Sequence, residues 1–180
     1  MALDHIMIDL ETLDNVPSGV VMSLGAVKFD IDSDKIDDNA FYASISIESN
    51  LDLGRTISES TINWWMQQEP KARAVFQEKK ISLATALMDF RGWMNDGVDY
   101  KMWGNGADFD QPFLQSAYRQ LKQEAPWKFW NNRCFRTFKN LPHAHKAKFM
   151  PSGVKHNALH DAMNQAKHAQ AIQKVLKGLK

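Results

Sequence analysis

The chain has 180 residues, 44% of them hydrophobic and 24% charged, and a formal net charge of +1, which suits one globular domain over residues 1–180. No apolar run approaches the roughly 18 residues of a membrane span, and "MALDHIMIDL" carries an acid and a histidine that a secretory signal would lack, so we expect neither. The single cysteine, Cys134, excludes an internal disulfide framework and suits a reducing cytoplasm, the predicted location, where it would be a small buried hydrophobe.

The stretch "HIMIDLETL", residues 5–13, is predicted to be a strand with one apolar and one acidic face. Side chains alternate along a strand, so Ile6 and Ile8 point one way while Asp9 and Glu11 point the other. Two carboxylates on one face repel each other unless a cation lies between them. A divalent metal ion is the candidate cation. The alternative is an edge strand whose acidic face is exposed to water.

Two more strands are predicted in the next part of the chain. "GVVMSLGAVKFDI" (19–31) is rich in β-branched and apolar residues, and "NAFYASISIE" (39–48) alternates. Its apolar face consists of Phe41, Ala43, Ile45 and Ile47. The acidic segment between them reads as a polar turn. It resembles the start of a calcium loop, but Lys35 stands where that loop needs glycine, so we do not expect calcium binding.

Helices and a fourth strand are predicted in residues 58–106. "SESTINWWMQQEPKARAVFQEKK" begins with Ser and Thr caps and reads as a helix broken near Pro70. "SLATALMDFRGWMND" (82–96) repeats apolar residues at helical spacing. "VDYKMWGNG" (98–106) then reads as a short strand that ends in a glycine turn.

The last third of the chain contains two further predicted helices. "DQPFLQSAYRQLKQE" (110–124) begins a helix with Asp110 at its N-cap. Residues 125–155 show no clear period and are predicted to be a long loop with short pieces of structure, and the final helix starts near Asn157. Three antiparallel strands, helices, further strand material and a final helix predict a mixed α/β sheet flanked by α-helices.

Acidic and basic residues are separated along the chain. Residues 1–60 hold 12 of the 21 acids, whereas residues 125–160 hold no acid and seven lysines and arginines. This asymmetry predicts an acidic site beside a basic track, as a metal enzyme acting on a polyanion would need. The alternative is that the basic stretch is ordinary solvated surface.

Three short motifs, distant in the chain, carry residues suited to metal-dependent chemistry. Asp9 and Glu11 share the first strand, and Asp110 follows "WGNGADF" at the start of a helix. His156 lies on a loop before the last helix and is separated from Asp161 by four residues. An acid or a histidine at one helix start is ordinarily structural. Together, however, the motifs form an ordered set.

With this order and spacing, the whole chain resembles the DEDD-type 3′–5′ exonucleases in their histidine subclass (DEDDh), which share a ribonuclease H-like fold. It is most similar to small phage and bacterial exonucleases, both exoribonuclease-like and exodeoxyribonuclease VIII-like. These also show the blocks "MIDLET", "SLGAVKF", "TINWWMQQ", "WGNGADFD" and "RCFRT".

The resemblance implies a set of metal ligands and a general base. Two divalent ions, Mg²⁺ or Mn²⁺, would be held by hard oxygen ligands and would activate a water and neutralise the leaving oxygen. His156 would accept the proton of that water. Asp108 would be an exposed neighbour, and His160 does not satisfy the spacing. The implied metal ligands are Asp9, Glu11, Asp110 and Asp161.

The resemblance also implies a substrate and contacts to it. The expected activity is 3′–5′ removal of nucleoside 5′-monophosphates from single-stranded RNA or DNA or from 3′ overhangs, with RNA favoured. Thr12 and Leu13 resemble positions that cradle the terminal nucleotide. One of the adjacent Trp64 and Trp65 could stack on a base, and we favour Trp64. The alternative is that both are partly buried, between helix and sheet or at a subunit contact. Arg136 is the favoured phosphate contact, and family members often form homodimers.

Three alternatives remain open at this point. One is a nucleic-acid-binding module that keeps the fold without turnover, although such a module has no chemical need of the five-residue set. Another is a ribonuclease H-fold endonuclease, which does not use the His-x4-Asp unit. A zinc site at His143 and His145 is the third, but it lacks cysteine partners and a HExxH helix.

Overall fold

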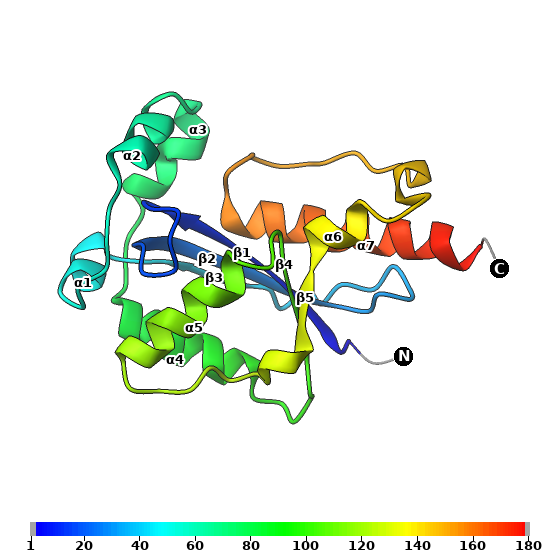
Figure 1. Ribbon diagram of the computed structural model, residues 1–180, viewed down its shortest axis with the longest axis horizontal. Coiled ribbons are helices and arrows are strands. Elements are labelled where there is room, and N and C mark those ends of the chain that lie inside the picture. The colour runs from blue at the N-terminus through cyan, green and yellow to red at the C-terminus, as the bar shows by residue number, and fades with distance from the viewer. Residues whose placement is uncertain (1–2, 179–180) are drawn as a thin grey trace.

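The centre of the computed structural model, which describes residues 3–178, is a five-stranded mixed β-sheet (Figure 1). Its strands are β1 (His5–Thr12), β2 (Val21–Phe29), β3 (Phe41–Ser44), β4 (Lys101–Gly104) and β5 (Asn132–Cys134). Their order is β3-β2-β1-β4-β5, with the first three antiparallel and β4 and β5 parallel to β1. The predicted α/β sheet is confirmed. The edge-strand alternative for residues 5–13 is wrong, because β1 is the central strand.

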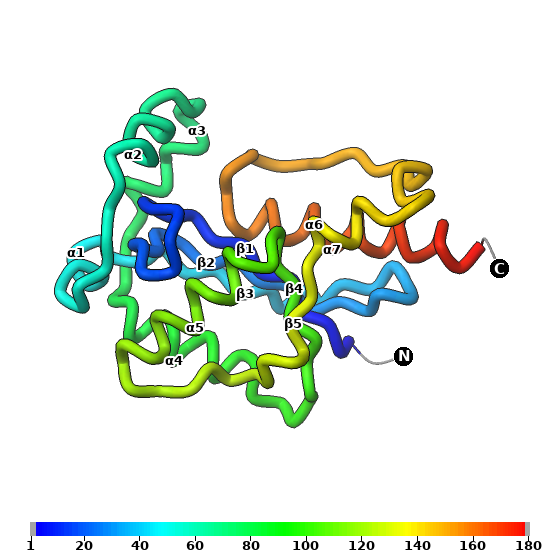
Figure 2. The backbone as a smooth tube through the Cα atoms, in the orientation of Figure 1, coloured from blue at the N-terminus to red at the C-terminus, as the bar shows by residue number. Residues whose placement is uncertain are grey.

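Helices cover both faces of this sheet, and the backbone trace shows others grouped at one end of it (Figure 2). The helices are α1 (Ile47–Leu51), α2 (Glu59–Met66), α3 (Pro70–Arg73), α4 (Leu83–Met94), α5 (Asp110–Gln120), α6 (Phe135–Lys139) and α7 (Ala158–Lys177). Short 3₁₀ turns are η1 (Ala74–Phe76), η2 (Phe129–Asn131) and η3 (Ala144–Lys146). None of the helices between residues 3 and 178 has both the length and the apolar character of a membrane span.

The side chains of β1 alternate between two hydrophobic clusters, one on each face of the sheet. Ile6, Ile8 and Leu10 pack with α4 and α5 on one face, whereas Met7 packs with α6 and α7 on the other. Trp65 of α2 belongs to a third cluster at the end of the sheet. Asp9 and Glu11 follow Met7 on the α7 face, as the period of two requires.

Helix α7 lies directly on the sheet at Gly25. A Cβ atom at this glycine would be 2.3 Å from the carbonyl carbon of Ala158. In the β1–β2 ladder Gly25 pairs with Asp9. The first turn of α7 is therefore held next to the acidic face of β1 by main-chain contact, without an intervening side chain.

Some predicted boundaries were wrong for local reasons. The third strand ends at Ser44, and Ile47 begins α1 because the Ser46 hydroxyl accepts the N–H of Ser49 and caps that helix. Asp110 is the first residue of α5 rather than its N-cap, which is Phe109. Cys134 is half-buried rather than fully buried, and its Sγ accepts the N–H of Thr137 at the start of α6.

Candidate functional site

The five predicted site residues converge where β1 meets the first turns of α5 and α7. Glu11, His156 and Asp161 each offer a ligand atom, and these atoms lie within 4.8 Å of one another. Asp9 lines the same cavity of about 520 Å³. Asp110 lies beside it, and its Oδ2 accepts the N–H of Asn105, another lining residue, at 2.8 Å.

Burial raises the pKa of these acids, and at Asp9 and Glu11 the neighbouring carboxylates add to the rise, as carboxyls do when no cation separates them. Burial, followed by the charges of Asp110, Glu11 and Asp161, raises the pKa of Asp9 well above its usual value. Burial and the charges of Asp161 and Asp110 raise the pKa of Glu11 to about 8. Burial raises the pKa of Asp110 to about 6, although the hydrogen bond from Asn105 opposes this rise. Such a set of buried oxygen donors suits a hard divalent cation.

His156 faces the acids from the loop before α7. Its φ is 60°, an uncommon value for a residue other than glycine, and its N–H donates to Asp161 Oδ2 at 2.8 Å. Burial, and then the charge of Lys155, lowers the pKa of the imidazole below its ordinary value. The ring is therefore unprotonated at neutral pH and able to accept a proton.

Two side chains of α7 hold the His156 loop against the helix. The amide of Asn164 donates to the Ser152 carbonyl at 2.8 Å and accepts the Ser152 N–H at 3.0 Å. His160 Nδ1 accepts the N–H of Val154 at 3.1 Å. His160 thus anchors the loop rather than lining the cavity, as its spacing from Asp161 predicted.

Sequence reasoning missed Gln165, which also lines the cavity. Its Nε2 donates to Asp9 Oδ1 at 2.7 Å, while its Oε1 is buried and has no hydrogen-bond partner among the described residues. A signal for it existed, because it lies four positions after Asp161 and the two share a face of α7. Gln165 is placed to orient the Asp9 carboxylate.

We expect Gln165→Leu to weaken Mn²⁺ binding about tenfold, because residues that orient a metal ligand typically contribute this much to affinity. Isothermal titration calorimetry measures the change. Gln173→Leu is the matched control, since Gln173 lies farther along α7 and donates to Asp32 instead. Equal Mn²⁺ affinities of Gln165→Leu and the parent protein would contradict the positioning role.

The adjacent tryptophans have opposite environments. Trp65 is 2% exposed and its Nε1 donates to the Thr12 carbonyl at 2.9 Å, so it belongs to the core. Trp64 is 40% exposed, and its ring centre lies 4.8 Å from that of His156. Trp64 is therefore the tryptophan that faces the site, as favoured from the sequence, and its contact with a base stays a prediction.

The remaining predicted substrate contacts differ in accessibility. Thr12 is buried, with its hydroxyl donating to the Asp14 carbonyl, and Leu13 is only 1% exposed within the third cluster. Neither lines the acidic cavity, so their contact with a nucleotide stays a prediction. Arg136 is exposed and donates to the Asn105 carbonyl at 2.7 Å, beside the acids. Asp108 is an exposed neighbour, as expected.

Comparisons with known proteins point to a family of nucleases. A family model described as the 3′-5′ exoribonuclease Rv2179c-like domain matches residues 4–173. An exodeoxyribonuclease of Enterobacteria phage T4 is 26% identical over an alignment of length 155, and the match covers 73% of this chain and 68% of that protein.

Two solved structures share the fold. The nuclease domain of 3′hExo, a DEDDh family member bound to rAMP, superposes with a TM-score of 0.61 at 16% identity, covering 96% of this chain and 91% of that one. Cell-death related nuclease 4 (CRN-4) gives a TM-score of 0.56 at 14% identity, covering 96% of this chain and 63% of that one.

Proposed function

Because the chain belongs to the family of 3′-5′ exoribonuclease Rv2179c-like domains, we propose that it shortens single-stranded nucleic acid, or 3′ overhangs, from the 3′ end. It is a DEDDh-type 3′–5′ exonuclease of the ribonuclease H-like superfamily. The proposed products are nucleoside 5′-monophosphates. The observation that carries the proposal is the meeting of the acids of β1, α5 and α7 with His156.

DEDDh nucleases use divalent metal ions, and the donor chemistry of this site fits them. We propose that two ions, Mg²⁺ or Mn²⁺, bind here. Bound divalent cations lower the pKa of a water and neutralise charge at a leaving oxygen. The proposed ligands are Asp9, Glu11, Asp110 and Asp161.

Side chains of the protein would accept the proton and position the substrate. His156 accepts the proton of the attacking water on a ring nitrogen, for which its lowered pKa keeps it available. Asn164 and Asp161 keep its loop on α7 during that transfer. Arg136 contacts a phosphate, and Trp64 stacks on a base beside the imidazole.

Residues 1–180 act as a single domain. We also expect a homodimer, which light scattering would detect.

The names of similar proteins point to both nucleic acids. The family description is an exoribonuclease, the phage T4 relative is called an exodeoxyribonuclease, and the 3′hExo structure is bound to rAMP. We propose RNA as the preferred substrate.

We expect RNA to be shortened about tenfold faster than DNA of the same sequence, because a contact to the 2′-hydroxyl would be lost on DNA. Parallel digestions of 5′-labelled 12-residue oligomers with Mg²⁺ or Mn²⁺ measure the rates, with chelator as control. Equal or faster digestion of DNA would contradict the preference. A single internal cut would indicate an endonuclease, and binding without cleavage would indicate a binding module.

A further inference from the structure

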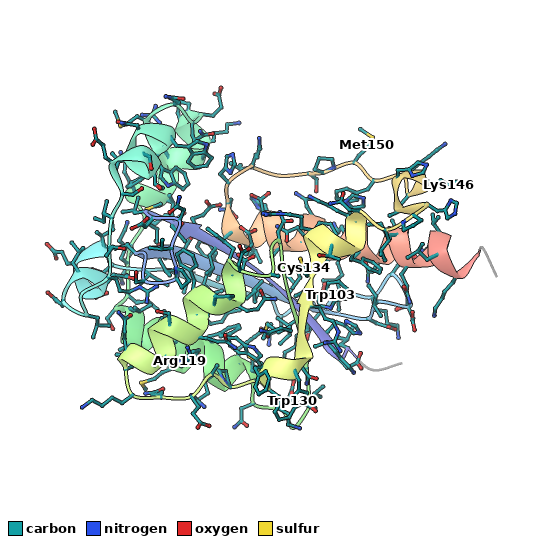
Figure 3. The ribbon with its side chains drawn as sticks, viewed as in Figure 1. Trp103, Arg119, Trp130, Cys134, Lys146 and Met150 are labelled. Atoms are coloured by element: carbon teal, nitrogen blue, oxygen red, sulfur yellow. The ribbon has the colours of Figure 1, made fainter. Side chains whose placement is uncertain are left out.

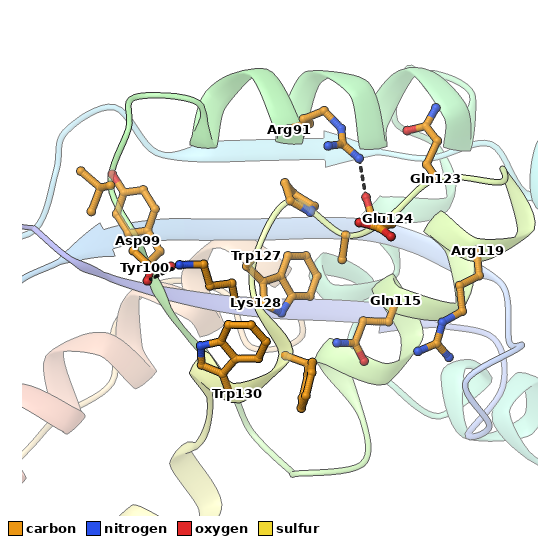
Figure 4. Close-up of a pocket in the computed structure, with 14 residues that line it drawn as sticks. Arg91, Asp99, Tyr100, Gln115, Arg119, Gln123, Glu124, Trp127, Lys128 and Trp130 are labelled. Carbon is orange, nitrogen blue, oxygen red and sulfur yellow. Dashed lines mark hydrogen bonds and ion pairs between the residues drawn. The ribbon is translucent and has the colours of Figure 1, made fainter.

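A second hollow, of about 680 Å³, lies between α4, α5 and the segment that follows α5 (Figure 4). Its lining contains none of the acids of the candidate site. Arg91, Arg119 and Lys128 contribute cationic side chains to it, while Asp99 and Glu124 are its acids. Asp99 is paired with Lys128 at 2.9 Å, and the main-chain carbonyl of Glu124 accepts a hydrogen bond from Arg91.

Two aromatic side chains at the rim of this hollow are unusually exposed. Phe129 is 69% exposed and Trp130 is 62% exposed, and their rings meet edge to face with centres 5.0 Å apart. The ammonium of Lys128 lies 5.9 Å from the centre of the Trp130 ring. Large aromatic rings on the surface commonly mark a binding site. Here they stand beside a cation.

The backbone that presents the two rings is held firmly. They belong to η2, where the Asn131 N–H donates to the Lys128 carbonyl at 2.9 Å. The Asn131 side chain donates to Asp99 at 2.9 Å, and buried Trp127 donates to Asn132 Oδ1 at 2.9 Å. Rings on a rigid turn lose little conformational entropy when a ligand stacks on them.

A line of basic residues joins the aromatic pair to the acidic site. Strand β5, an edge strand of the sheet, runs from η2 to α6 (Figure 1). Figure 3 labels Trp130, in η2 before the strand, and Cys134, the last residue of the strand. Arg133 lies on it and donates to the Trp130 carbonyl at 3.2 Å. At the far end, Arg136 contacts the main chain of Asn105, whose N–H binds Asp110.

We propose that Phe129 and Trp130 form a stacking platform for unpaired bases of the substrate, a few nucleotides upstream of the 3′ bond that is cleaved. This inference rests on the proposed function. The phosphates between the platform and the acidic site contact Arg133 on β5 and Arg136 in α6. Stacking on aromatic rings accepts every base, which suits an enzyme that shortens a strand of any sequence.

The charge of this path favours a nucleic acid over a second copy of the chain. Residues 125–160, which include η2, β5 and α6, contain no acid. Asp99, which contacts η2, is paired with Lys128, so Arg133 and Arg136 leave the path positive. Two such surfaces would repel each other, whereas a polyanion would be attracted.

We expect Trp130→Ala to weaken binding of a 12-nucleotide single strand about tenfold, the effect of losing one stacked base. Fluorescence anisotropy of a 5′-labelled 12-mer measures this with every protein in an Asp110→Asn background, so that the oligomer stays intact. In the active protein, KM for the 12-mer rises by a similar factor while kcat/KM for a dinucleotide, too short to reach the platform, is unchanged. Met88→Ala is the control, because Met88 is 61% exposed on α4, outside the path.

Three results would contradict the proposal that Phe129 and Trp130 form a stacking platform. One is an unchanged Kd of Trp130→Ala for the 12-mer. Another is an equal loss on the 12-mer and the dinucleotide, which would indicate a structural role. The third is a dimeric parent protein that becomes monomeric in Trp130→Ala, which would make the rings a contact between copies. If the parent protein cleaves no oligomer, the proposed function fails, and the binding comparison still decides the platform.

Discussion

Asp110→Asn is expected to lower kcat for shortening a 3′ end by about a thousandfold. The carboxylate is buried at the start of α5, where its Oδ2 accepts the N–H of Asn105. An asparagine keeps that hydrogen bond but removes a ligand charge. Charge stabilisation by the bound cation is typically worth several kcal/mol, and each 1.36 kcal/mol changes the rate about tenfold. Single-turnover digestion of a labelled oligomer at saturating metal measures the effect.

Asp108→Asn is the matched control, because it makes the same chemical change two positions earlier on an exposed side chain. Its kcat should equal that of the parent protein. In chelator, Asp110→Asn should melt at the same temperature as the parent or higher, since it removes one of several mutually repelling carboxylates. If Asp108→Asn were as slow as Asp110→Asn, the assignment of Asp110 as a ligand would fail.

In chelator, the melting temperature is expected to fall as pH rises from about 5 to 8. Burial holds the pKa of Glu11 at about 8 and that of Asp110 at about 6, both above their values in an unfolded chain. The folded protein therefore binds more protons than the unfolded chain in this range, and its free energy of unfolding declines as those protons leave. The decline should amount to a few kcal/mol, or about 5–10 °C for a chain of this length.

Saturating Mg²⁺ or Mn²⁺ should remove most of this pH dependence and raise the melting temperature at pH 8, because a cation replaces the protons between the carboxylates. Differential scanning fluorimetry across pH, with and without metal, measures both effects. A Glu11→Gln variant should show a shallower decline in chelator. A melting temperature that increased with pH in chelator would contradict the mutual repulsion of the acids.

The sequence signals that point to the acidic site are local. Alternation along residues 5–13 placed Asp9 and Glu11 on one face, and the Asn157 cap left His156 on a loop facing the helix that carries Asp161. The resemblance to DEDDh exonucleases then indicated that these motifs belong to one site. No propensity argument by itself brings β1 and α7 together, since that contact depends on the tertiary fold.

The features of the fold and of the site that could not be predicted from the sequence depend on contacts between residues far apart in the chain. Strand β5 has three residues, too few for a period, and exists because it pairs with β4. Ile47 fitted a strand pattern, but the Ser46 cap and the Asn50 side chain, which bonds the main chain of Val21, favour a helix. The spacing of Gln165 from Asp161 places it on the face of α7 that carries that acid, but its contact with Asp9 depends on the packing of α7 over β1.

Main-chain contact at Gly25 makes the width of the acidic site insensitive to most side-chain changes. The Cβ atom of an alanine at this position would lie 2.3 Å from the carbonyl carbon of Ala158, whereas ordinary contact begins at 3.4 Å. Helix α7 would therefore move outward by about 1 Å. Displacements of that size at reacting groups can slow an enzyme a hundredfold. We therefore expect relatives to keep glycine at this contact between β2 and α7. Their substitutions should accumulate around the opening of the acidic cavity, where they would change substrate specificity without altering the chemistry.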